Sequence, residues 1–253
     1  MDAKYIIKWT FTPEDYFEEP FKIEDECFEM WVDIGTVKAE IVEEICFDPN
    51  IEAKKLHSIL EGRFYGAEIF LHKPFSLSGP SIIKLDADGR KHYYLHAKSG
   101  VVAMTVGRSE SELVDKNGKL ILSTRRDRIE KILLFSELVS KYKLIDPVVD
   151  SIITSYHNAI IYPENEFVYL YEIRDALVDR FGNEKNAIDA IKVSRKSFRR
   201  LRQLACNEPL AQGRHRGEHV GKIRAATEVE IAEARTIARK MIMNYLLYID
   251  NKK

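Results

Sequence analysis

Cysteines are few in this sequence and long apolar runs are absent, and both shortages narrow what the protein can be. The 253 residues include three cysteines (Cys27, Cys46 and Cys206), too few and too scattered for a disulfide framework or a CxxC zinc site. No run of 18 or more apolar residues occurs, which excludes a membrane-spanning helix. The first residues also lack the basic start, apolar stretch and small-residue cleavage site of a secretory signal peptide. We therefore expect a protein of a reducing compartment, the cytoplasm, with no membrane partner.

The common short motifs for phosphate binding and hydrolysis are absent as well. None of GxxxxGKS/T, GxGxxG and GxSxG occurs, which excludes the usual phosphate loops and the hydrolase nucleophile elbow. His92 and His96 are four residues apart, but they fall on a predicted strand, where that spacing does not bring two side chains onto one metal ion. The sequence therefore predicts neither a metal site nor a cofactor.

The net charge of −1 hides an asymmetry along the chain. Residues 1–123 carry 15 basic and 22 acidic side chains, whereas residues 124–253 carry 24 basic and 18 acidic ones. The segment Lys192–Arg224 alone contains ten basic and two acidic residues. A local cationic field of this kind attracts nucleic acid, although a solvated helix face rich in arginine and lysine gives the same count.

Residues 1–122 are predicted to form a β-rich domain, whose role the sequence does not reveal. Four runs are rich in β-branched and aromatic residues and alternate in part, as strands do: Lys4–Phe11, Cys27–Ile34, Thr36–Ile45 and Arg63–Leu71. Turn sequences at 86–91 (DADGRK) and 115–119 (DKNGK) indicate two hairpins. A helix is predicted to interrupt the sheet at Asn50–Glu61.

Residues 123–253 are predicted to form an all-α bundle, because the apolar period changes to 3.6 residues there. Several helix ends carry the residues that such ends require. Gly182 suits a helix C-terminus, Asn183 and Ser194 suit N-caps, and Thr227–Glu230 has the capping-box pattern. The predicted fold class is therefore α+β, with the β-rich domain preceding the helical bundle.

The stretch 211–221, AQGRHRGEHVG, contains residues suited to chemistry on a phosphate. A histidine can accept or release a proton near neutral pH, and an arginine can bind a phosphate and stabilise charge that develops on it. RNA supplies its own nucleophile, the 2′-hydroxyl, so its cleavage requires an acid and a base but no metal ion. Arg214 and His219 are spaced to provide such a set, although a solvated loop would be equally polar.

The hexapeptide Arg214–His219 (RHRGEH) resembles the R-polar-x3-H motif of the HEPN superfamily (higher eukaryotes and prokaryotes nucleotide-binding domains). The order of the surrounding segments is similar too. A helix containing YLYEIRDAL (169–177) and a short helix precede SRKSFRRLRQLACNEPL (194–210), and the motif and a final helix rich in Ala and Glu follow. This order resembles the ApeA-type HEPN-like group over roughly residues 125–250.

The resemblance implies a metal-independent endoribonuclease of a defence or toxin-type system, with one composite site formed by the motifs of a homodimer. It assigns phosphate binding to Arg214, acid–base chemistry to His219 and the polar position to His215. It also assigns to Glu172 the place of the acidic residue that faces the motif. The basic stretch predicts RNA contacts by five further arginines, which are Arg195, Arg199, Arg200, Arg202 and Arg216.

Two other functions fit the same residues. The helical half can serve as a non-catalytic dimerising module for binding or sensing. Alternatively, Asn186–Leu201 (NAIDAIKVSRKSFRRL) can form a DNA-binding helix-turn-helix, with Lys192 near the place of the usual turn glycine. Both helices can also simply belong to the bundle, with their arginines on its solvent-exposed face.

Overall fold

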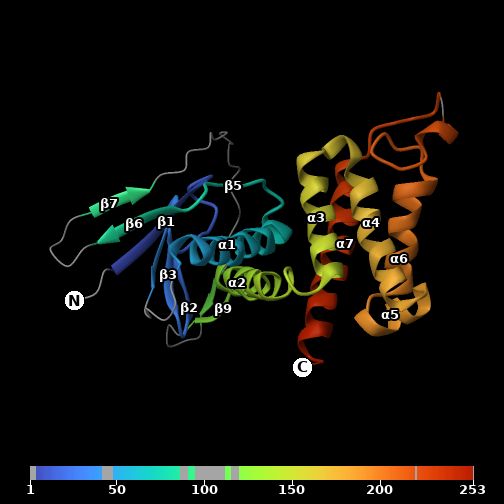
Figure 1. Cartoon of the computed structure of the whole chain (residues 1–253). Helices are drawn as coiled ribbons and strands as arrows, with labels where there is room; N and C mark the ends of the chain where they lie inside the picture. Colours follow the sequence, from blue (N-terminus) through green and yellow to red (C-terminus); the bar gives the residue numbers. More distant parts are fainter. Residues whose placement is uncertain are drawn as a thin grey trace. The chain divides into compact units, whose positions relative to one another are not determined.

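The computed structural model describes residues 4–41, 48–85, 91–94, 112–114, 120–219 and 221–252. It has the predicted α+β fold, with an antiparallel sheet in the N-terminal part and helices in the C-terminal part (Figure 1). The chain divides into two compact units, one formed by Met1–Phe64 and Phe75–Leu133 and the other by Tyr65–Pro74 and Leu134–Lys253. The second unit therefore combines the C-terminal helices with the short segment Tyr65–Pro74, which lies about sixty residues earlier in the sequence.

The first unit contains a seven-stranded sheet with the strand order β2-β3-β4-β1-β6-β7, and β5 pairs with β1. Its strands are β1 (Lys4–Thr12), β2 (Phe21–Asp25), β3 (Phe28–Asp33), β4 (Thr36–Ile41), β5 (Ser76–Leu77), β6 (Ser81–Leu85) and β7 (Lys91–Tyr94). On β1, Ile7, Trp9 and Phe11 are buried while Lys8 and Thr10 are exposed, which is the period of two expected for a sheet with one covered face. The helix α1 (Pro49–Leu71) lies along this sheet (Figure 1).

Three of the four predicted strands are confirmed and the fourth is wrong. Residues 63–71 lie in α1, which continues well beyond the predicted helix Asn50–Glu61. Leu56, Leu60, Phe64 and Ala67 recur on one helical face and are fully buried, and the Phe64 ring packs against Phe11 with centroids 5.0 Å apart. Burial of this face therefore overrides the strand preference of the aromatic and β-branched residues.

Both predicted hairpins form. Strands β6 and β7 pair antiparallel, and so do β8 (Glu112–Val114) and β9 (Leu120–Ser123). Their connecting turns, like the end of the predicted strand beyond Ile41, lie outside the described residues.

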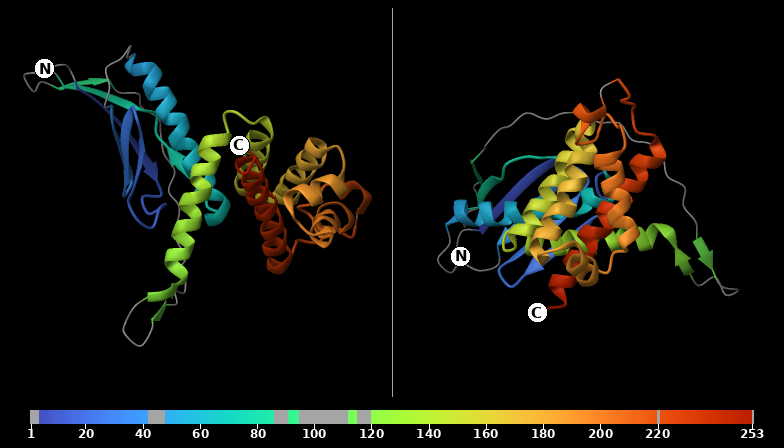
Figure 2. Two further views of the ribbon diagram at one scale, coloured as in Figure 1. Left: turned by 90° about the horizontal axis from the view of Figure 1, so that it is seen from below. Right: turned by 90° about the vertical axis from the view of Figure 1, so that its right-hand side faces the viewer.

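The second unit is a helical bundle, as predicted. Its helices are the C-terminal parts of α1 and of α2 (Thr124–Tyr142), together with α3 (Pro147–Ile161), α4 (Glu166–Phe181), α5 (Glu184–Ile191), α6 (Arg195–Arg202) and α7 (Glu228–Asp250). Figure 1 shows α3, α4 and α6 side by side, and α7 packs against all three (Figure 2). The core between them is almost entirely apolar and includes Phe167, Leu170, Phe198, Met241 and Tyr245.

The predicted helix ends are confirmed in atomic detail. Gly182 has φ 79°, the left-handed conformation that glycine adopts without a steric penalty. The side chains of Asn183 and Ser194 accept hydrogen bonds from backbone N–H groups three residues ahead. Thr227 and Glu230 form both hydrogen bonds of the capping box at the start of α7. Local sequence therefore sets where these helices begin and end.

A buried polar network surrounds His72 within the second unit. The Nδ1 atom of His72 lies 3.3 Å from the Tyr156 hydroxyl, and its Nε2 atom lies 3.7 Å from the carboxylate of Glu166. Glu166 is buried and accepts two hydrogen bonds from Arg235, at 2.6 and 2.9 Å. Burial, together with the positive charges of Arg235 and Arg239, lowers the pKa of His72 to about 3. His72 is therefore neutral in the folded protein at physiological pH.

Gly66→Ala is expected to destabilise the protein, although alanine is the better helix former by about 1 kcal/mol. A Cβ atom on residue 66 would lie 2.4 Å from the Cα atom of Ser136 and 2.8 Å from the Phe135 carbonyl oxygen. Because both contacts are with backbone, α1 and α2 would have to separate, at a net cost of about 2–3 kcal/mol. Thermal and denaturant unfolding measure the loss. Gly217→Ala is the control, since a Cβ atom there meets nothing within 4 Å, and equal stability of the two variants would contradict the prediction.

Candidate nucleic-acid interface

The segment between α6 and α7 is an anchored loop. A π-helical turn, Gln203–Asn207, follows α6 directly, and its Ala205 carbonyl oxygen accepts a hydrogen bond from the Arg214 N–H at 2.7 Å. Gly213 allows this approach, because a Cβ atom there would lie 3.0 Å from the same oxygen. Leu210 is fully buried and fixes the start of the loop in the core. The basic loop is therefore held close to the end of α6, which determines where its side chains can reach.

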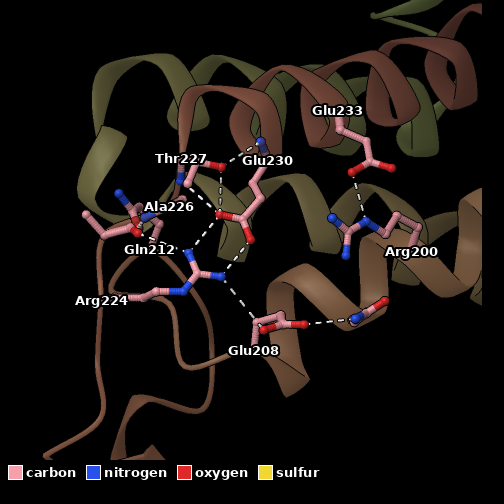
Figure 3. Close-up of polar contacts among 10 residues, drawn as sticks. Arg200, Glu208, Gln212, Arg224, Ala226, Thr227, Glu230 and Glu233 are labelled. Carbon is pink, nitrogen blue, oxygen red and sulfur yellow. Dashed lines mark hydrogen bonds and ion pairs between the residues drawn. The ribbon is translucent and has the colours of Figure 1, made fainter.

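The base of the loop is fastened to the start of α7 by Arg224 (Figure 3). Its guanidinium donates to both carboxylate oxygens of Glu230, at 2.7 and 2.8 Å, and lies 3.8 Å from Glu208. The backbone of Arg224 also forms hydrogen bonds with the backbone of Pro209 and Ala211, the two residues on either side of Leu210. The hydrogen bond from Arg224, with those from Thr227, lowers the pKa of Glu230 to about 2. This carboxylate therefore stays ionised, and its ion pair closes the loop throughout the physiological pH range.

Arg214 is held by two side chains of α4. Its guanidinium donates to the Asp175 carboxylate at 2.9 Å and lies over the ring of Tyr171, 4.9 Å from the centroid. The side chain of Arg214 nevertheless keeps 37% of its surface exposed. A guanidinium that is oriented by an acid and an aromatic face, yet open to solvent, is prepared to bind a phosphate without first being ordered.

A second arginine, Arg174, is buried and holds the two side chains that contact Arg214. Arg174 donates to the Tyr171 hydroxyl at 3.1 Å, to Asp175 at 2.9 Å and to Glu184 at 2.5 Å. Its guanidinium also lies over the ring of Phe198, 5.8 Å from the centroid. Because Arg174 fixes both residues that hold Arg214, it is part of the same site. The spacing of Tyr171, Arg174 and Asp175, at i, i+3 and i+4 on one helix face, is the sequence signal that could have found it.

The other predicted site residues are distributed around the loop. Glu172 is exposed and accepts a hydrogen bond from Ser155 at 3.1 Å, while Asp175 is the acid that contacts Arg214. His215 is exposed and lies 3.3 Å from the Glu218 carboxylate. The Arg216–His219 segment is a 3₁₀ turn. The side chain of His219 lies outside the described residues.

Arg216 differs from Arg214 in that two nitrogens of its guanidinium donate hydrogen bonds within the protein. It donates to the Gly213 carbonyl oxygen at 2.9 Å and to the side-chain oxygen of Asn165. The contact with Asn165 ties the turn to the segment before α4, and the contact with Gly213 lies within the loop itself. Arg216 therefore has fewer donors left for a nucleic acid than Arg214 has.

Three of the predicted nucleic-acid-binding arginines form one exposed stripe on α6. Arg195, Arg199 and Arg202 follow the i, i+4, i+7 spacing of a helix face, and none forms an ion pair with another residue of the described part of the chain. Arg200 points elsewhere and pairs with Glu233 of α7 at 2.8 Å (Figure 3).

The stripe leads toward the loop. Burial raises the pKa of the Tyr171 hydroxyl and of the Cys206 thiol, and in both cases the nearby charge of Arg202 opposes the rise. Arg214 acts on Cys206 in the same way. Arg202 and Arg214 therefore both lie near Cys206 and Tyr171. The three arginines of the stripe and Arg214 are here called the arginine track: Arg195, Arg199, Arg202 and Arg214.

Comparisons with known proteins add no relative to this picture. No protein-family model, curated protein or solved structure matches the chain. Among the described residues, no helix is long and apolar enough to cross a membrane, and no group of three or more His, Cys, Asp or Glu side chains is placed to hold a metal ion.

Proposed function

We propose that this chain is a HEPN-like protein that binds single-stranded RNA along the arginine track and cleaves it without a metal ion. The arrangement of Arg214 carries the proposal. It is anchored by Asp175 and Tyr171, it is open to solvent, and it shares the neighbourhood of Tyr171 and Cys206 with Arg202 of the α6 stripe. The i, i+4 spacing of side chains on a helix is about 6 Å, which is comparable to the distance between successive phosphates in a nucleic-acid strand.

In this proposal the RNA strand supplies the nucleophile. The 2′-oxygen attacks the adjacent phosphorus as a base removes its proton, and the bond to the 5′-oxygen breaks as an acid protonates the leaving oxygen. The products are a 2′,3′-cyclic phosphate and a free 5′-hydroxyl. Arg214 stabilises the charge on the phosphate oxygens, and His219 is the acid–base group. A second copy of the chain contributes the partner motif, which supplies the group with the opposite protonation role.

Replacing Arg195, Arg199 and Arg202 together by glutamine is expected to weaken RNA binding and its dependence on salt. Each single-strand phosphate contact contributes about 0.7 to the slope of log K against log salt concentration, so three lost contacts lower the slope by about 2. Fluorescence anisotropy with a labelled single-stranded RNA, measured over a range of salt concentrations, gives both quantities. The control variant has three exposed lysines outside the arginine track, Lys131, Lys185 and Lys240, replaced by glutamine, so that its net charge is the same. Equal salt slopes for the two variants would contradict the arginine track.

Binding of duplex DNA through a helix-turn-helix is a second candidate, favoured by one specific observation. Lys192, which joins α5 to α6, has φ 53° and ψ 38°, the left-handed conformation for which glycine is usually chosen in such a turn. The exposed stripe on α6 would then face the major groove. The same anisotropy experiment distinguishes the two functions, since a helix-turn-helix predicts tighter binding to duplex DNA than to single-stranded RNA. RNA binding without cleavage would instead favour a non-catalytic module.

A further inference from the structure

Among the residues whose side chains the structure describes, Tyr162 is the only exposed aromatic one. It lies between α3 and α4, at the end of the bundle where the loop between α6 and α7 also lies (Figure 1). Asn165, three residues later, accepts the hydrogen bond from Arg216 of that loop. We propose that Tyr162 stacks on an unpaired base of the RNA, next to the phosphate that Arg214 binds. The inference rests on the proposed function and adds a subsite for a base to it.

The protein holds the ring of Tyr162 in place. The ring lies against that of Tyr169 on α4, with centroids 6.1 Å apart and an angle of 39° between the planes, and Tyr169 packs against the core of the bundle. The N–H of Tyr162 donates to the Asn158 carbonyl oxygen at 2.9 Å, and its own carbonyl oxygen accepts from the Asn165 N–H at 2.9 Å. Tyr162 nevertheless remains 45% exposed. A ring that is ordered before the ligand binds loses little conformational freedom on stacking.

Tyr171, the other tyrosine near the loop, has a different role. It is only 7% exposed, and the guanidiniums of Arg174 and Arg214 lie 5.0 and 4.9 Å from its ring centroid. Tyr171 therefore orients Arg214 and has no surface for a base, whereas Tyr162 keeps nearly half of its surface open. Single-stranded nucleic acid is bound by this combination, with basic groups along the backbone and aromatic rings under the bases.

The positions of Tyr162 and Arg214 suit neighbouring nucleotides. Arg214 lies over Tyr171, which is five residues after Glu166, the first residue of α4. Five residues correspond to about 7–8 Å along a helix axis, which is comparable to the distance between successive phosphates in a strand. A strand with one phosphate on Arg214 that continues toward the start of α4 therefore brings the base of a neighbouring nucleotide to Tyr162.

Glu164 determines which part of the nucleotide faces Tyr162. Its side chain is exposed, two residues from Tyr162, and accepts a hydrogen bond from the Asn165 amide at 3.4 Å. A phosphate beside this carboxylate would be repelled, whereas an uncharged base would not. We therefore expect the phosphates on the side of the loop arginines and the base on the side of Tyr162.

Binding of a labelled RNA tests the subsite without requiring cleavage. The probe is an oligoadenylate with a 2′-O-methyl group on every ribose, so that it lacks the attacking hydroxyl. Tyr162→Ala is expected to weaken its binding by about 5- to 100-fold, the contribution of one base stacked on an aromatic ring. Tyr162→Phe and Tyr162→Trp are expected to retain the affinity, because stacking requires a ring and not the hydroxyl. Ile161→Ala is the matched control, since it removes the neighbouring exposed apolar side chain, and it should leave the affinity unchanged.

A second probe separates the base from the phosphates. It has the same length but abasic nucleotides throughout, so that it keeps the phosphates and lacks every base. Tyr162→Ala should bind this probe as the wild type does, because nothing remains to stack on the ring. The triple glutamine variant of Arg195, Arg199 and Arg202 should bind both probes more weakly, because the phosphates are present in each.

Several outcomes would overturn the subsite. These are equal affinity of wild type and Tyr162→Ala for the oligoadenylate, an equal loss in Ile161→Ala, or an equal loss on the abasic probe. Loss of self-association in Tyr162→Ala would assign the ring to contact with a second copy of this chain. A wild-type protein that binds neither probe refutes the proposed function and the subsite together, whereas arginine-dependent binding that is insensitive to Tyr162→Ala refutes the subsite alone.

Discussion

His219→Ala is expected to lower the rate of RNA cleavage by about 10²–10⁴-fold, the usual contribution of a general acid or base. Arg214→Ala is expected to lower it by about 10²–10³-fold, because a donor that stabilises developing charge is lost. Both losses should appear in EDTA as clearly as in magnesium, since the 2′-hydroxyl is the nucleophile of the proposed reaction and no metal ion takes part in it. The measurement is cleavage of a labelled single-stranded RNA by the full chain, with the products identified by their 2′,3′-cyclic phosphate ends.

The substrate itself provides the sharpest control for this reaction. A strand with one 2′-deoxy position at the cleavage site should bind normally and remain intact, because it lacks the attacking oxygen. Lys240→Gln, an exposed charge on α7, should leave the rate unchanged. Absence of cleavage by the wild-type protein, or equal rates for wild type and His219→Ala, would end the catalytic proposal and leave the binding functions.

For the acidic residue of the site, the resemblance and the structure point to two different residues of α4, Glu172 and Asp175. Glu172 is the acid that the resemblance places opposite the motif, and Asp175 is the acid that contacts Arg214 in the structure. The two residues are three positions apart on α4, but Glu172 accepts a hydrogen bond from Ser155 of α3, whereas Asp175 accepts one from Arg214 of the loop. Helix periodicity predicts the buried face of α4 well, because Phe167, Leu170 and Leu177 are core residues. It does not reveal which neighbouring acid meets a loop that starts some thirty residues later.

The exposure of the loop between α6 and α7 can be predicted from the sequence, but its anchoring cannot. Its composition predicts exposure, and Arg214, His215 and Glu218 are indeed exposed. Its anchoring depends on contacts that are distant in sequence, namely the buried Leu210 and the pairing of Arg224 with Glu230. Helix caps could be predicted because each is a hydrogen bond between residues three positions apart. The helix at residues 63–71 could not be predicted, because distant contacts make it more favourable than a strand: Phe64 packs against Phe11 of the sheet, and Ile69 belongs to the core of the helical bundle.

His72→Asn is expected to make stability less sensitive to acid. The pKa of His72 falls from about 6.5 to about 3 on folding, because the ring is buried and faces Arg235 and Arg239. Between these two pH values the unfolded chain binds a proton that the folded protein does not, so stability decreases as the pH is lowered. At about 1.4 kcal/mol per pKa unit, His72 alone removes about 2–3 kcal/mol between pH 7.5 and 4.5.

Asparagine is the appropriate replacement because His72 has φ 47°, a left-handed conformation that asparagine tolerates. The variant loses packing and the contact with Tyr156, but that loss is the same at every pH, so the difference in slope isolates the titration. The other groups facing His72 are Tyr156 and Glu166, and Arg235 keeps Glu166 paired. Glu68, whose pKa is raised by burial, acts with the opposite sign, since its folded form takes up a proton at higher pH, yet it is present in both proteins. Denaturant unfolding at several pH values between 7.5 and 4.5 measures the two slopes, and parallel slopes would show that folding does not lower the pKa of His72.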